Sequence, residues 1–473
     1  MNAVPSVHRT LPVRDPRSGA VDLYIGAAGG AEVADAARRL RGAQPAWRAL
    51  GADRRAVILA RWADALEAAQ GEIVTALSRD TGRLQVALGE VAGAIRNVRR
   101  WSREAPGLLQ VAERDSALLP TVKLAGGLVP YPLVGVISPW NFPVTLSLID
   151  AVPALAAGCA VLIKPSEVTP RFVAPLQKTL RAVPELEAVL DFVLGDGATG
   201  AALVDVSDAV CFTGSVPNGR KVAEAAARRF IPAFLELGGK DPALVLQGAD
   251  LDRASDAVLR ASCMATGQAC LSIERVYVDR RIFEEFVAML VAKANRIGIN
   301  HPDISQGQLG PLIFSRQADI IDAQLDDALA KGARILCGGK TSNLGGGRWC
   351  RATVLVDVDH RMSLMTEETF GPIIPVMPFD DLDEAIALAN DSDFGLSAAV
   401  FAATLEEARA VAERLNAGGV SLNDAGLTYQ TYEAEKNSFG YSGLGGSRMG
   451  PCSILRFVRK QAYLMQTAAP AKL

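Results

Sequence analysis

Between residues 133 and 237, apolar strand-like segments alternate with segments of helical periodicity, and this alternation constrains the fold more than any other feature of the chain. The expected strands are nearly continuous apolar runs, as strands buried on both faces of a parallel sheet are. Such alternation predicts an α/β domain whose parallel sheet is covered by helices on both sides. The expected strands are 133–138, 160–164, 190–194, 209–213 and 233–237, and the expected helices are 145–157, 170–182, 198–204 and 217–228.

A second α/β series is expected after residue 253, and helices are expected before residue 109. The length of 473 residues leaves room for two or three domains with large cores. The further helices are expected at 31–47, 53–78, 84–102, 253–265, 281–297, 316–331, 381–389 and 404–416. The further strands are expected at 275–278, 373–378, 398–402 and 419–422, with a β region at 334–357.

Two segments outside these series have β-like character. Residues 109–130 form short β-like pieces, with a turn expected at Gly126 and Gly127, and residues 453–466 form an arm without glycine or proline. Together they predict an exposed β-flap, and a free strand edge of this kind can pair with a neighbouring subunit.

The charge and the apolar runs exclude two classes of partner. The net charge is -3 with no basic stripe, so nucleic acid is not an expected partner. The longest apolar run, 143–163, contains Asp150 and is interrupted by Pro153 and Gly158, which predicts a buried helix and strand instead of a membrane span.

The cysteines and histidines indicate a reducing compartment and no metal site. The seven cysteines are an odd, scattered set without a C-x-x-C pair, which favours a cytoplasmic protein. The three histidines, His8, His301 and His360, lie outside any motif, so neither a Cys-His pair nor a histidine metal site is expected.

Cys270 is the candidate nucleophile. It follows Gly267, Gln268 and Ala269 and precedes the strand expected at 275–278. A glycine near a cysteine lets the main chain approach whatever the sulfur attacks, which suits a thiolate nucleophile. Free cysteines are also often simply buried, so this stretch alone leaves both interpretations open.

Two glycine-containing turns are candidates for binding a nucleotide. The segment 212–219 joins an expected strand to a helix, where free N–H groups and the helix dipole attract phosphate. The segment 195–200 fits G-x-G-x-x-G after a strand, although a single match is weak. Both turns lie at the carboxyl ends of parallel strands, where nucleotides bind in open sheets, but either could be an ordinary βα turn.

Three further strand ends carry polar side chains. Lys164 and Glu167 could bind ribose hydroxyls, in which case Glu167 would repel a 2′-phosphate and favour NAD over NADP, or they could be a solvated pair. Asn141, between Pro139 and Pro143, could donate to an oxyanion or stabilise a turn. Glu236 could act as a base of raised pKa or be a strand-end surface charge.

The chain resembles the aldehyde dehydrogenase superfamily, of the NAD(P)-dependent hydrolytic type. The resemblance rests on motifs in the family's order: P-W-N-F-P from Pro139, K-P-S-E from Lys164, F-T-G-S from Phe212, E-L-G-G-K from Glu236, G-Q-A-C from Gly267 and E-E-T-F-G-P from Glu367. Each motif is weak alone, but six in order are specific. They span residues 139–372, and the expected elements fit the family over nearly the whole chain.

The resemblance implies a role for each motif residue. Cys270 is implied to be the nucleophile, Asn141 with the Cys270 N–H the oxyanion hole, and Glu236 the general base. The implied cofactor-binding residues are Trp140, Lys164, Glu167, Gly195, Gly197, Gly214, Ser215, Glu368 and Phe370. NAD is the expected cofactor and NADP remains open.

The implied reaction oxidises an aldehyde to a carboxylic acid. A thiolate adds to the aldehyde carbon, hydride leaves for the nicotinamide, and base-activated water hydrolyses the thioester. A CoA-acylating enzyme is one alternative, which Glu236 disfavours because a thiol acceptor needs no activated water. A catalytically silent binding protein on the same fold is another, disfavoured by the presence of Cys270, Glu236 and Asn141.

The C-terminal sequence departs from the family pattern near the substrate mouth. Many members read P-F-G-G-x-K-x-S-G, whereas residues 437–443 keep only the final Ser442-Gly443. Distance from the motifs suggests seven apolar or aromatic tunnel positions, which favour an apolar or aromatic aldehyde unless they are plain core residues. They are Phe142, Leu146, Ile149, Met264, Leu271, Tyr429 and Tyr432.

The resemblance also divides the chain into three parts. It implies a Rossmann-like NAD-binding domain of residues 1–108 and 131–238, and an α/β catalytic domain of residues 239–439. A small β arm with the C-terminal tail, residues 109–130 and 440–473, would join subunits into a homodimer or homotetramer.

Overall fold

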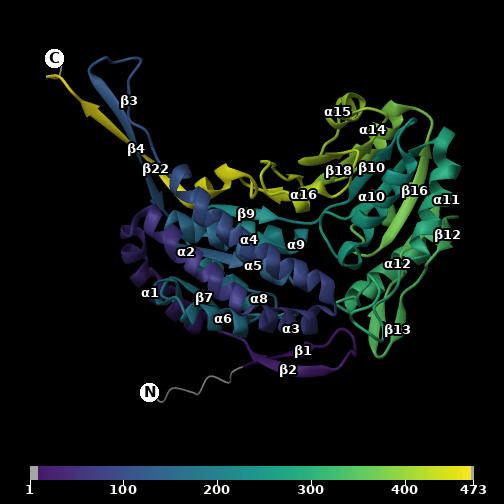
Figure 1. Cartoon of the computed structure of the whole chain (residues 1–473), viewed down its shortest axis with the longest axis horizontal. Helices are drawn as coiled ribbons and strands as arrows, with labels where there is room; N and C mark the ends of the chain where they lie inside the picture. The colour runs from purple at the N-terminus through teal and green to yellow at the C-terminus, as the bar shows by residue number, and fades with distance from the viewer. Residues whose placement is uncertain (1–8, 470–473) are drawn as a thin grey trace.

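The structure is a computed structural model that describes residues 9–469, and it contains two large sheets and a projecting β-ribbon (Figure 1). The first sheet has the strand order β21-β9-β8-β5-β6-β7. Its five parallel strands are β5 (Leu133–Ile137), β6 (Ala160–Lys164), β7 (Leu190–Phe192), β8 (Ala209–Thr213) and β9 (Ala233–Glu236), and the antiparallel strand is β21 (Gly443–Leu444).

The strand order fixes where a ligand can enter this sheet. The chain starts at β5 in the middle, runs outward through β6 and β7, and then returns to the other side through β8 and β9. Neighbouring strands β5 and β8 therefore lead away in opposite directions, and open α/β sheets bind ligands in the crevice at such a switch point. The prediction of a Rossmann-like parallel sheet is confirmed.

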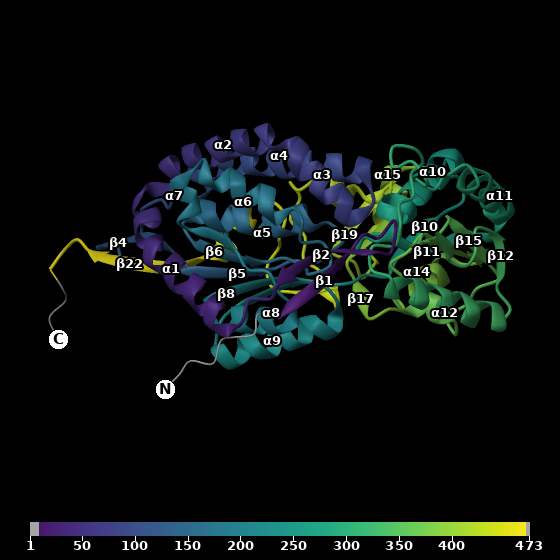
Figure 2. The ribbon, with the colours of Figure 1, turned by 90° about the horizontal axis from the view of Figure 1, so that it is seen from below.

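Helices cover both faces of the first sheet (Figure 2). Helices α5 and α6 lie on one face, with α2 and α4 stacked outside them, and α8 and α9 lie on the other face. The helices of this half are α1 (Gly30–Ala49), α2 (Gly51–Ala68), α3 (Gln70–Thr81), α4 (Leu84–Leu108), α5 (Pro143–Ala157), α6 (Val173–Arg181), α7 (Pro184–Glu187), α8 (Gly197–Val206) and α9 (Val216–Arg229).

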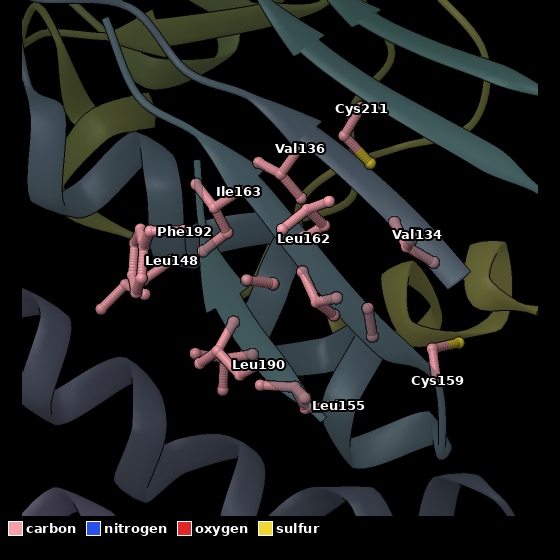
Figure 3. Packing of buried hydrophobic residues seen from close by; sticks show 14 of the residues in the cluster. Val134, Val136, Leu148, Leu155, Cys159, Leu162, Ile163, Leu190, Phe192 and Cys211 are labelled. Carbon is pink, nitrogen blue, oxygen red and sulfur yellow. The ribbon is translucent and has the colours of Figure 1, made fainter. Parts of the chain in front are cut away.

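The core of this half explains the apolar strand sequences. Every residue of β5, β6 and β8 is buried, and side chains such as Val136, Ile163 and Leu148 pack between the sheet and α5 (Figure 3). Helix α5 begins at Pro143, whose fixed φ suits a first helical turn, and is capped by Gly158, whose φ of 104° is left-handed. The apolar run 143–163 is thus a buried helix and strand, and within residues 9–469 no helix is long and apolar enough to cross a membrane.

The second sheet has seven strands in the order β12-β15-β16-β11-β10-β18-β19, all parallel except β12. They are β10 (Asp241–Val245), β11 (Ile273–Asp279), β12 (Arg334–Cys337), β15 (Thr353–Val356), β16 (Ile373–Phe379), β18 (Ser397–Phe401) and β19 (Gly419–Leu422). Its helices are α10 (Leu251–Cys263), α11 (Phe283–Ala294), α12 (Arg316–Ala330), α13 (Ser363–Thr366), α14 (Leu382–Asn390), α15 (Leu405–Ala412) and α16 (Leu427–Gln430), with 3-10 turns η1 (Met264–Gly267) and η2 (Arg280–Ile282).

The remaining elements are small. A hairpin of β1 (Thr10–Arg14) and β2 (Val21–Gly26) precedes the first helix. Two further short pairs are β13 (Ser342–Leu344) with β14 (Gly347–Trp349), and β17 (Phe394–Gly395) with β20 (Phe439–Gly440). The ribbon consists of β3 (Arg114–Asp115), β4 (Val122–Pro130) and β22 (Val458–Gln466), preceded by η3 (Pro451–Phe457).

Two expectations from the sequence are wrong in detail. The helix expected at 53–78 is two helices that meet at Ala69. The turn expected at Gly126 and Gly127 lies inside β4, opposite Ala462 and Gln461 of β22. A Cβ at Gly127 would lie 2.7 Å from the Tyr463 hydroxyl, so the glycine makes room for a cross-strand ring instead of bending the chain.

A buried charge cluster fastens the C-terminal segment to α5. Asp150 accepts hydrogen bonds from Arg448 at 2.7 Å and from Arg456 at 2.8 Å, and its side chain is 1% exposed. Burial by itself would raise the pKa of Asp150, but the two guanidinium groups together lower it. A carboxyl with a lowered pKa stabilises the fold above its unfolded pKa of about 4, and this contribution is lost as the pH falls through the folded pKa.

We expect Asp150→Asn to destabilise the protein by about 3–5 kcal/mol, because it leaves two buried guanidinium groups without a counter-charge. The urea midpoint of unfolding at pH 7 should fall at an unchanged slope. The control is Asp35→Asn, which removes an exposed ion pair to Arg38 and should shift the free energy of unfolding by less than about 0.5 kcal/mol. Equal midpoints for the two variants would contradict the prediction.

Candidate active site

The two sheets meet where the carboxyl ends of β5, β8 and β9 face the amino ends of β10 and β11. The chain passes from β9 to β10 through only four residues, 237–240. Glycines make this passage narrow: a Cβ at Gly239 would lie 2.5 Å from the Cys270 carbonyl oxygen, and one at Gly238 would lie 2.6 Å from the Glu368 carboxylate. The predicted nucleophile and one predicted cofactor ligand therefore lie against the same short strand connection.

Cys270 follows a strained turn. After α10 ends, Ala265, Thr266 and Gly267 adopt left-handed φ values of 52°, 63° and 67°. Non-glycine residues in this region cost of order 1–3 kcal/mol each and persist only where their surroundings hold them. A Cβ at Gly267 would lie 2.2 Å from the carbonyl carbon of Gly371, so only glycine allows this close approach of two main chains.

The buried Gln268 side chain holds the turn in place. Its Oε1 accepts from the Ile313 N–H at 2.9 Å, and its Nε2 donates to the carbonyls of Ala265 and Pro311 at 3.2 and 3.1 Å. All three polar positions of the amide are thus satisfied by main chain. Gln268 fixes the residues immediately before the candidate nucleophile.

The surroundings of Cys270 disfavour ionisation of its thiol. Burial raises the pKa of Cys270 to about 12, and the carboxylates of Glu368 and Asp241 push it in the same direction. Acidic groups this close disfavour a further negative charge on the sulfur. Formation of the thiolate therefore requires a proton acceptor close to Cys270.

Asn141 lies beside the nucleophile loop. Its side chain is buried, and Nδ2 donates to the main-chain oxygen of Gln268 at 3.0 Å. The position after β5 and the two flanking prolines, Pro139 and Pro143, bring it to the switch point of the first sheet. The fold thereby brings together Asn141 and Cys270, which are 129 positions apart in the sequence.

Glu236 ends β9 and is half-buried. Its Oε2 accepts a hydrogen bond from the Ser438 hydroxyl at 2.7 Å, and Gly443 of β21 pairs with it across the sheet edge. Glu236 also contributes to the raised pKa of Cys270, which places the two groups in the same electrostatic environment. Ser438 was not predicted from the sequence, although it lies in the segment where the sequence departs from the family pattern.

Glu368 and Phe370 occupy the loop before β16. Glu368 Oε1 accepts from the Gly239 N–H at 3.1 Å, and burial raises the pKa of Glu368 to about 8, with Glu274 contributing in the same direction. Phe370 has a φ of 52°, and its ring meets Trp140 edge-on at 5.5 Å between centroids.

A buried ion pair holds this loop. Glu274 accepts from Lys240 Nζ and from the Thr369 N–H, both at 2.7 Å, and from the Phe370 N–H at 2.8 Å. The pair links the strand connection 237–240 to the loop that carries Glu368 and Phe370. Neither Lys240 nor Glu274 was predicted as functional, because their partners lie far away in the sequence.

The other predicted cofactor residues lie at the carboxyl edge of the first sheet. Lys164 ends β6, is buried and pairs with Glu167 at 3.0 Å. Gly214 and Ser215 lead from β8 into α9, and in the described residues no side chain caps the first turn of α9. Gly195 and Gly197 lie after the outermost strand β7, and Gly197 starts α8.

This edge fits a dinucleotide. A Cβ at Gly214 would lie 2.6 Å from the Phe212 ring, so the β8–α9 turn has room only for main chain. Uncapped N–H groups at the start of α9 offer donors to phosphate, and the Lys164–Glu167 pair offers a donor and an acceptor to hydroxyl groups. Across residues 9–469, no group of three or more His, Cys, Asp or Glu side chains is arranged to hold a metal ion.

The seven predicted tunnel residues are all half-buried. Phe142, Leu146 and Ile149 follow one another at helical spacing at the start of α5. Burial raises the pKa of Tyr432, and the nearby Glu90 and Cys270 contribute in the same direction. Tyr429 lies close to Arg260 near the end of α10. Met264 and Leu271 flank the nucleophile turn.

Comparison with known proteins gives a consistent result. The model of the Aldehyde dehydrogenase family matches residues 3–462. The chain is 36% identical over 427 residues to the protein named putative succinate-semialdehyde dehydrogenase (NADP(+)) 2 of Mycobacterium ulcerans, covering 89% of this chain and 82% of that protein. It is 41% identical over 352 residues to 4,4'-diapolycopene aldehyde oxidase of Methylomonas sp, covering 74% of this chain and 65% of the relative.

Solved structures agree over almost the full length. The putative aldehyde dehydrogenase PutA from Anabaena variabilis has a TM-score of 0.97 and 52% identity, with 98% of this chain and 99% of that chain covered. Lactaldehyde dehydrogenase from Escherichia coli has a TM-score of 0.93 and 30% identity, with 98% and 96% covered.

Proposed function

Because the chain belongs to the aldehyde dehydrogenase family and is an NAD(P)-dependent oxidoreductase, we propose that it oxidises an aldehyde to a carboxylic acid through a covalent intermediate on Cys270. The observation that carries this proposal is the convergence of Cys270, Asn141 and Glu236 at the junction of the two sheets.

The first step forms a bond between Cys270 Sγ and the aldehyde carbon. The thiol proton passes to a base, and the electron pair of the carbonyl moves onto its oxygen. The Asn141 amide and the Cys270 main-chain N–H are the proposed donors to this oxyanion. To donate to it, Asn141 Nδ2 gives up its hydrogen bond to the Gln268 carbonyl oxygen and bonds to the substrate oxygen instead. A nicotinamide held beside Trp140 and Phe370 would supply the acceptor for the hydride whose loss converts the adduct into a thioester.

The second step hydrolyses the thioester. Glu236 is the proposed base, which takes a proton from water so that the oxygen can attack the acyl carbon and the carbon–sulfur bond breaks. The hydrogen bond from Ser438 holds the Glu236 carboxylate at the edge of the first sheet. Products are the carboxylic acid and the free thiol.

The proposed cofactor contacts lie at the carboxyl edge of the first sheet. Lys164 and Glu167 are proposed to bind the adenosine ribose, the β8–α9 turn with Gly214 and Ser215 the pyrophosphate, and Gly195 and Gly197 the adenine side. Trp140 and Phe370 are proposed to line the nicotinamide pocket, where Glu368 binds the second ribose. Relatives are named for both cofactors: NADP(+) for the Mycobacterium ulcerans protein and NAD for an aldehyde dehydrogenase of Sinorhizobium meliloti.

The proposed substrate is an apolar or aromatic aldehyde, because the seven predicted tunnel residues are apolar or aromatic and half-buried. The named relatives span both possibilities, since diapolycopene aldehyde is the substrate in one name and succinate semialdehyde in another. Selection between them comes from the side chains that line the approach to Cys270.

A panel of aldehydes assayed with NAD and with NADP tests the function. We expect reduced cofactor to form, with higher kcat/KM for benzaldehyde and long alkanals than for succinate semialdehyde, and for NAD than for NADP. Reduced cofactor that appears only when CoA is added would instead identify an acylating enzyme. No reduced cofactor over the whole panel, with Cys270 inert to iodoacetamide, would indicate a binding protein.

We also propose that the chain forms a homodimer or homotetramer in the cytoplasm through the β-ribbon. Among residues 9–469, strand β22 pairs with β4 on one side and with no strand on the other, and Leu464 on it is 74% exposed. A free edge with exposed apolar side chains favours pairing with a second copy. A solution mass of two or four times 49.9 kDa is expected by light scattering, and a monomer would contradict the proposal.

A further inference from the structure

Arg83 is a buried arginine that the proposed reaction does not use. It precedes α4 and is 2% exposed. Its guanidinium makes no ion pair with a carboxylate among the described residues; it donates instead to two main-chain carbonyls. Nη1 donates to Ala265 at 2.8 Å, and Nη2 donates to Asn141 at 2.5 Å. One planar group thus joins the loop of the nucleophile to the loop of the oxyanion donor.

The contact to Ala265 acts on the strained turn. The Ala265 carbonyl accepts from Arg83 at 2.8 Å, from Gln268 Nε2 at 3.2 Å and from the Gln268 N–H at 3.3 Å. Residues in sparsely populated conformations need such over-determined surroundings. Arg83 is the one of these donors that comes from outside the turn, from the first half of the chain.

The contact to Asn141 acts on the amide. The Asn141 main-chain carbonyl accepts from Arg83 while its side chain donates to Gln268, so both ends of the residue are held. Glu90 lies further along α4. It accepts hydrogen bonds from the Val144 and Thr145 N–H groups at 2.8 and 2.9 Å and so fixes the start of α5. The Arg83 guanidinium also lies 5.5 Å from the centre of the Phe142 ring.

We propose that Arg83 is a positioning residue that sets the separation between the Asn141 amide and Cys270, and so controls how well the oxyanion is stabilised. The inference rests on the proposed roles of those two residues. A lysine cannot replace Arg83, because one ammonium cannot span both carbonyls as a planar fork of donors does.

The test compares two reactions of Cys270 that need no cofactor. Acylation by p-nitrophenyl acetate forms an oxyanion at the carbonyl, whereas alkylation by iodoacetamide displaces iodide and forms none. The ratio of the two rates therefore measures the oxyanion donors separately from the reactivity of the sulfur. The measurements use a Cys452→Ser background, because Cys452 is exposed and would react as well, and a Cys270→Ala variant gives the blank.

Arg83→Lys is expected to lower the acylation rate about 10²-fold and to leave the alkylation rate within a factor of two, since loss of an oxyanion donor costs about 10²–10³-fold. Asn141→Ala should lower the same ratio. Adding Arg83→Lys to Asn141→Ala should have no further effect on the ratio, because a positioning residue has nothing left to position.

Arg55→Lys is the matched control. Arg55 is also buried, and it donates to the main-chain carbonyls of Ala156 and Arg48 at 3.0 and 3.1 Å, away from the two loops. Both lysine variants are expected to lower the urea midpoint, but only Arg83→Lys should change the ratio of rates.

Three results would overturn the inference: an unchanged ratio in Arg83→Lys, an equal fall of acylation and alkylation, or the same fall of the ratio in Arg55→Lys. If Arg83→Lys yields no folded protein, Arg83→Gln replaces it, because glutamine keeps a planar donor of smaller reach. Its ratio of acylation to alkylation rates is expected to lie between those of the wild type and Asn141→Ala. A wild-type protein that forms no reduced cofactor, yet shows the expected ratios, would refute the proposed function and leave the role of Arg83 intact.

Discussion

Replacing Cys270 by alanine is expected to lower aldehyde-dependent formation of reduced cofactor by about 10⁴-fold or more, the scale on which covalent enzymes lose activity without their nucleophile. Within residues 9–469, Cys270 is the only cysteine that is half-buried, and it lies at the sheet junction; five of the others are buried and Cys452 is exposed. No other sulfur is placed to form the proposed thioester.

The measurement is the initial rate of absorbance at 340 nm with the best aldehyde of the panel. Cys452→Ala is the control and should retain the wild-type rate, because Cys452 is exposed and bonds through its N–H to Glu435. Both variants should bind NAD with the same affinity, measured by calorimetry. Residual oxidation by Cys270→Ala within tenfold of the wild type would remove the sulfur from the reaction.

Glu236→Gln is expected to slow turnover by about 10²–10⁴-fold, the usual contribution of a general base, while leaving the first formation of the thioester less affected. The amide keeps the shape of the side chain and its bond to Ser438 but cannot accept a proton from water. Mixing the variant with NAD and aldehyde should give a burst of one equivalent of reduced cofactor per subunit, followed by a slow steady state.

Intact-mass spectrometry during that slow phase should show the acyl group on Cys270. Glu433→Gln is the matched control, because Glu433 is an exposed carboxylate in the same C-terminal segment. It should turn over like the wild type and accumulate no adduct. A Glu236→Gln variant that turns over slowly without an acylated Cys270 would assign the proton transfer to another group.

The sequence predicted those helices and strands that a local apolar pattern determines. The alternation of strands and helices after residue 133 is confirmed, because strands buried on both faces are mostly apolar. The strand β10, in the interior of the second sheet, was not predicted because it begins with Asp241-Pro242, a pair that is typical of turns. The register shift at Asp241 and Pro242 accommodates the proline at the start of this strand.

In the candidate site, too, local motifs could be predicted from the sequence, whereas contacts between distant residues could not. The motifs pointed to residues at or near strand ends, such as Glu236 at the end of β9 and Lys164 at the end of β6. The groups that hold them were not predictable, because Arg83 lies 58 positions from Asn141 and Ser438 lies 202 positions from Glu236. Such contacts depend on how helices and the C-terminal segment pack on the sheets, and no local pattern encodes that packing.

The path of the chain between the sheets limits how this enzyme could be recombined with its relatives. The polypeptide leaves the first sheet once, at residues 237–240, and returns when β21 pairs with β9. A hybrid therefore needs two crossovers, one in this short passage and one shortly before Ser438, with the last stretch inherited from the same parent as β9 and α5. Otherwise the Ser438–Glu236 hydrogen bond and the Arg448–Asp150 ion pair would each join residues from two different parents.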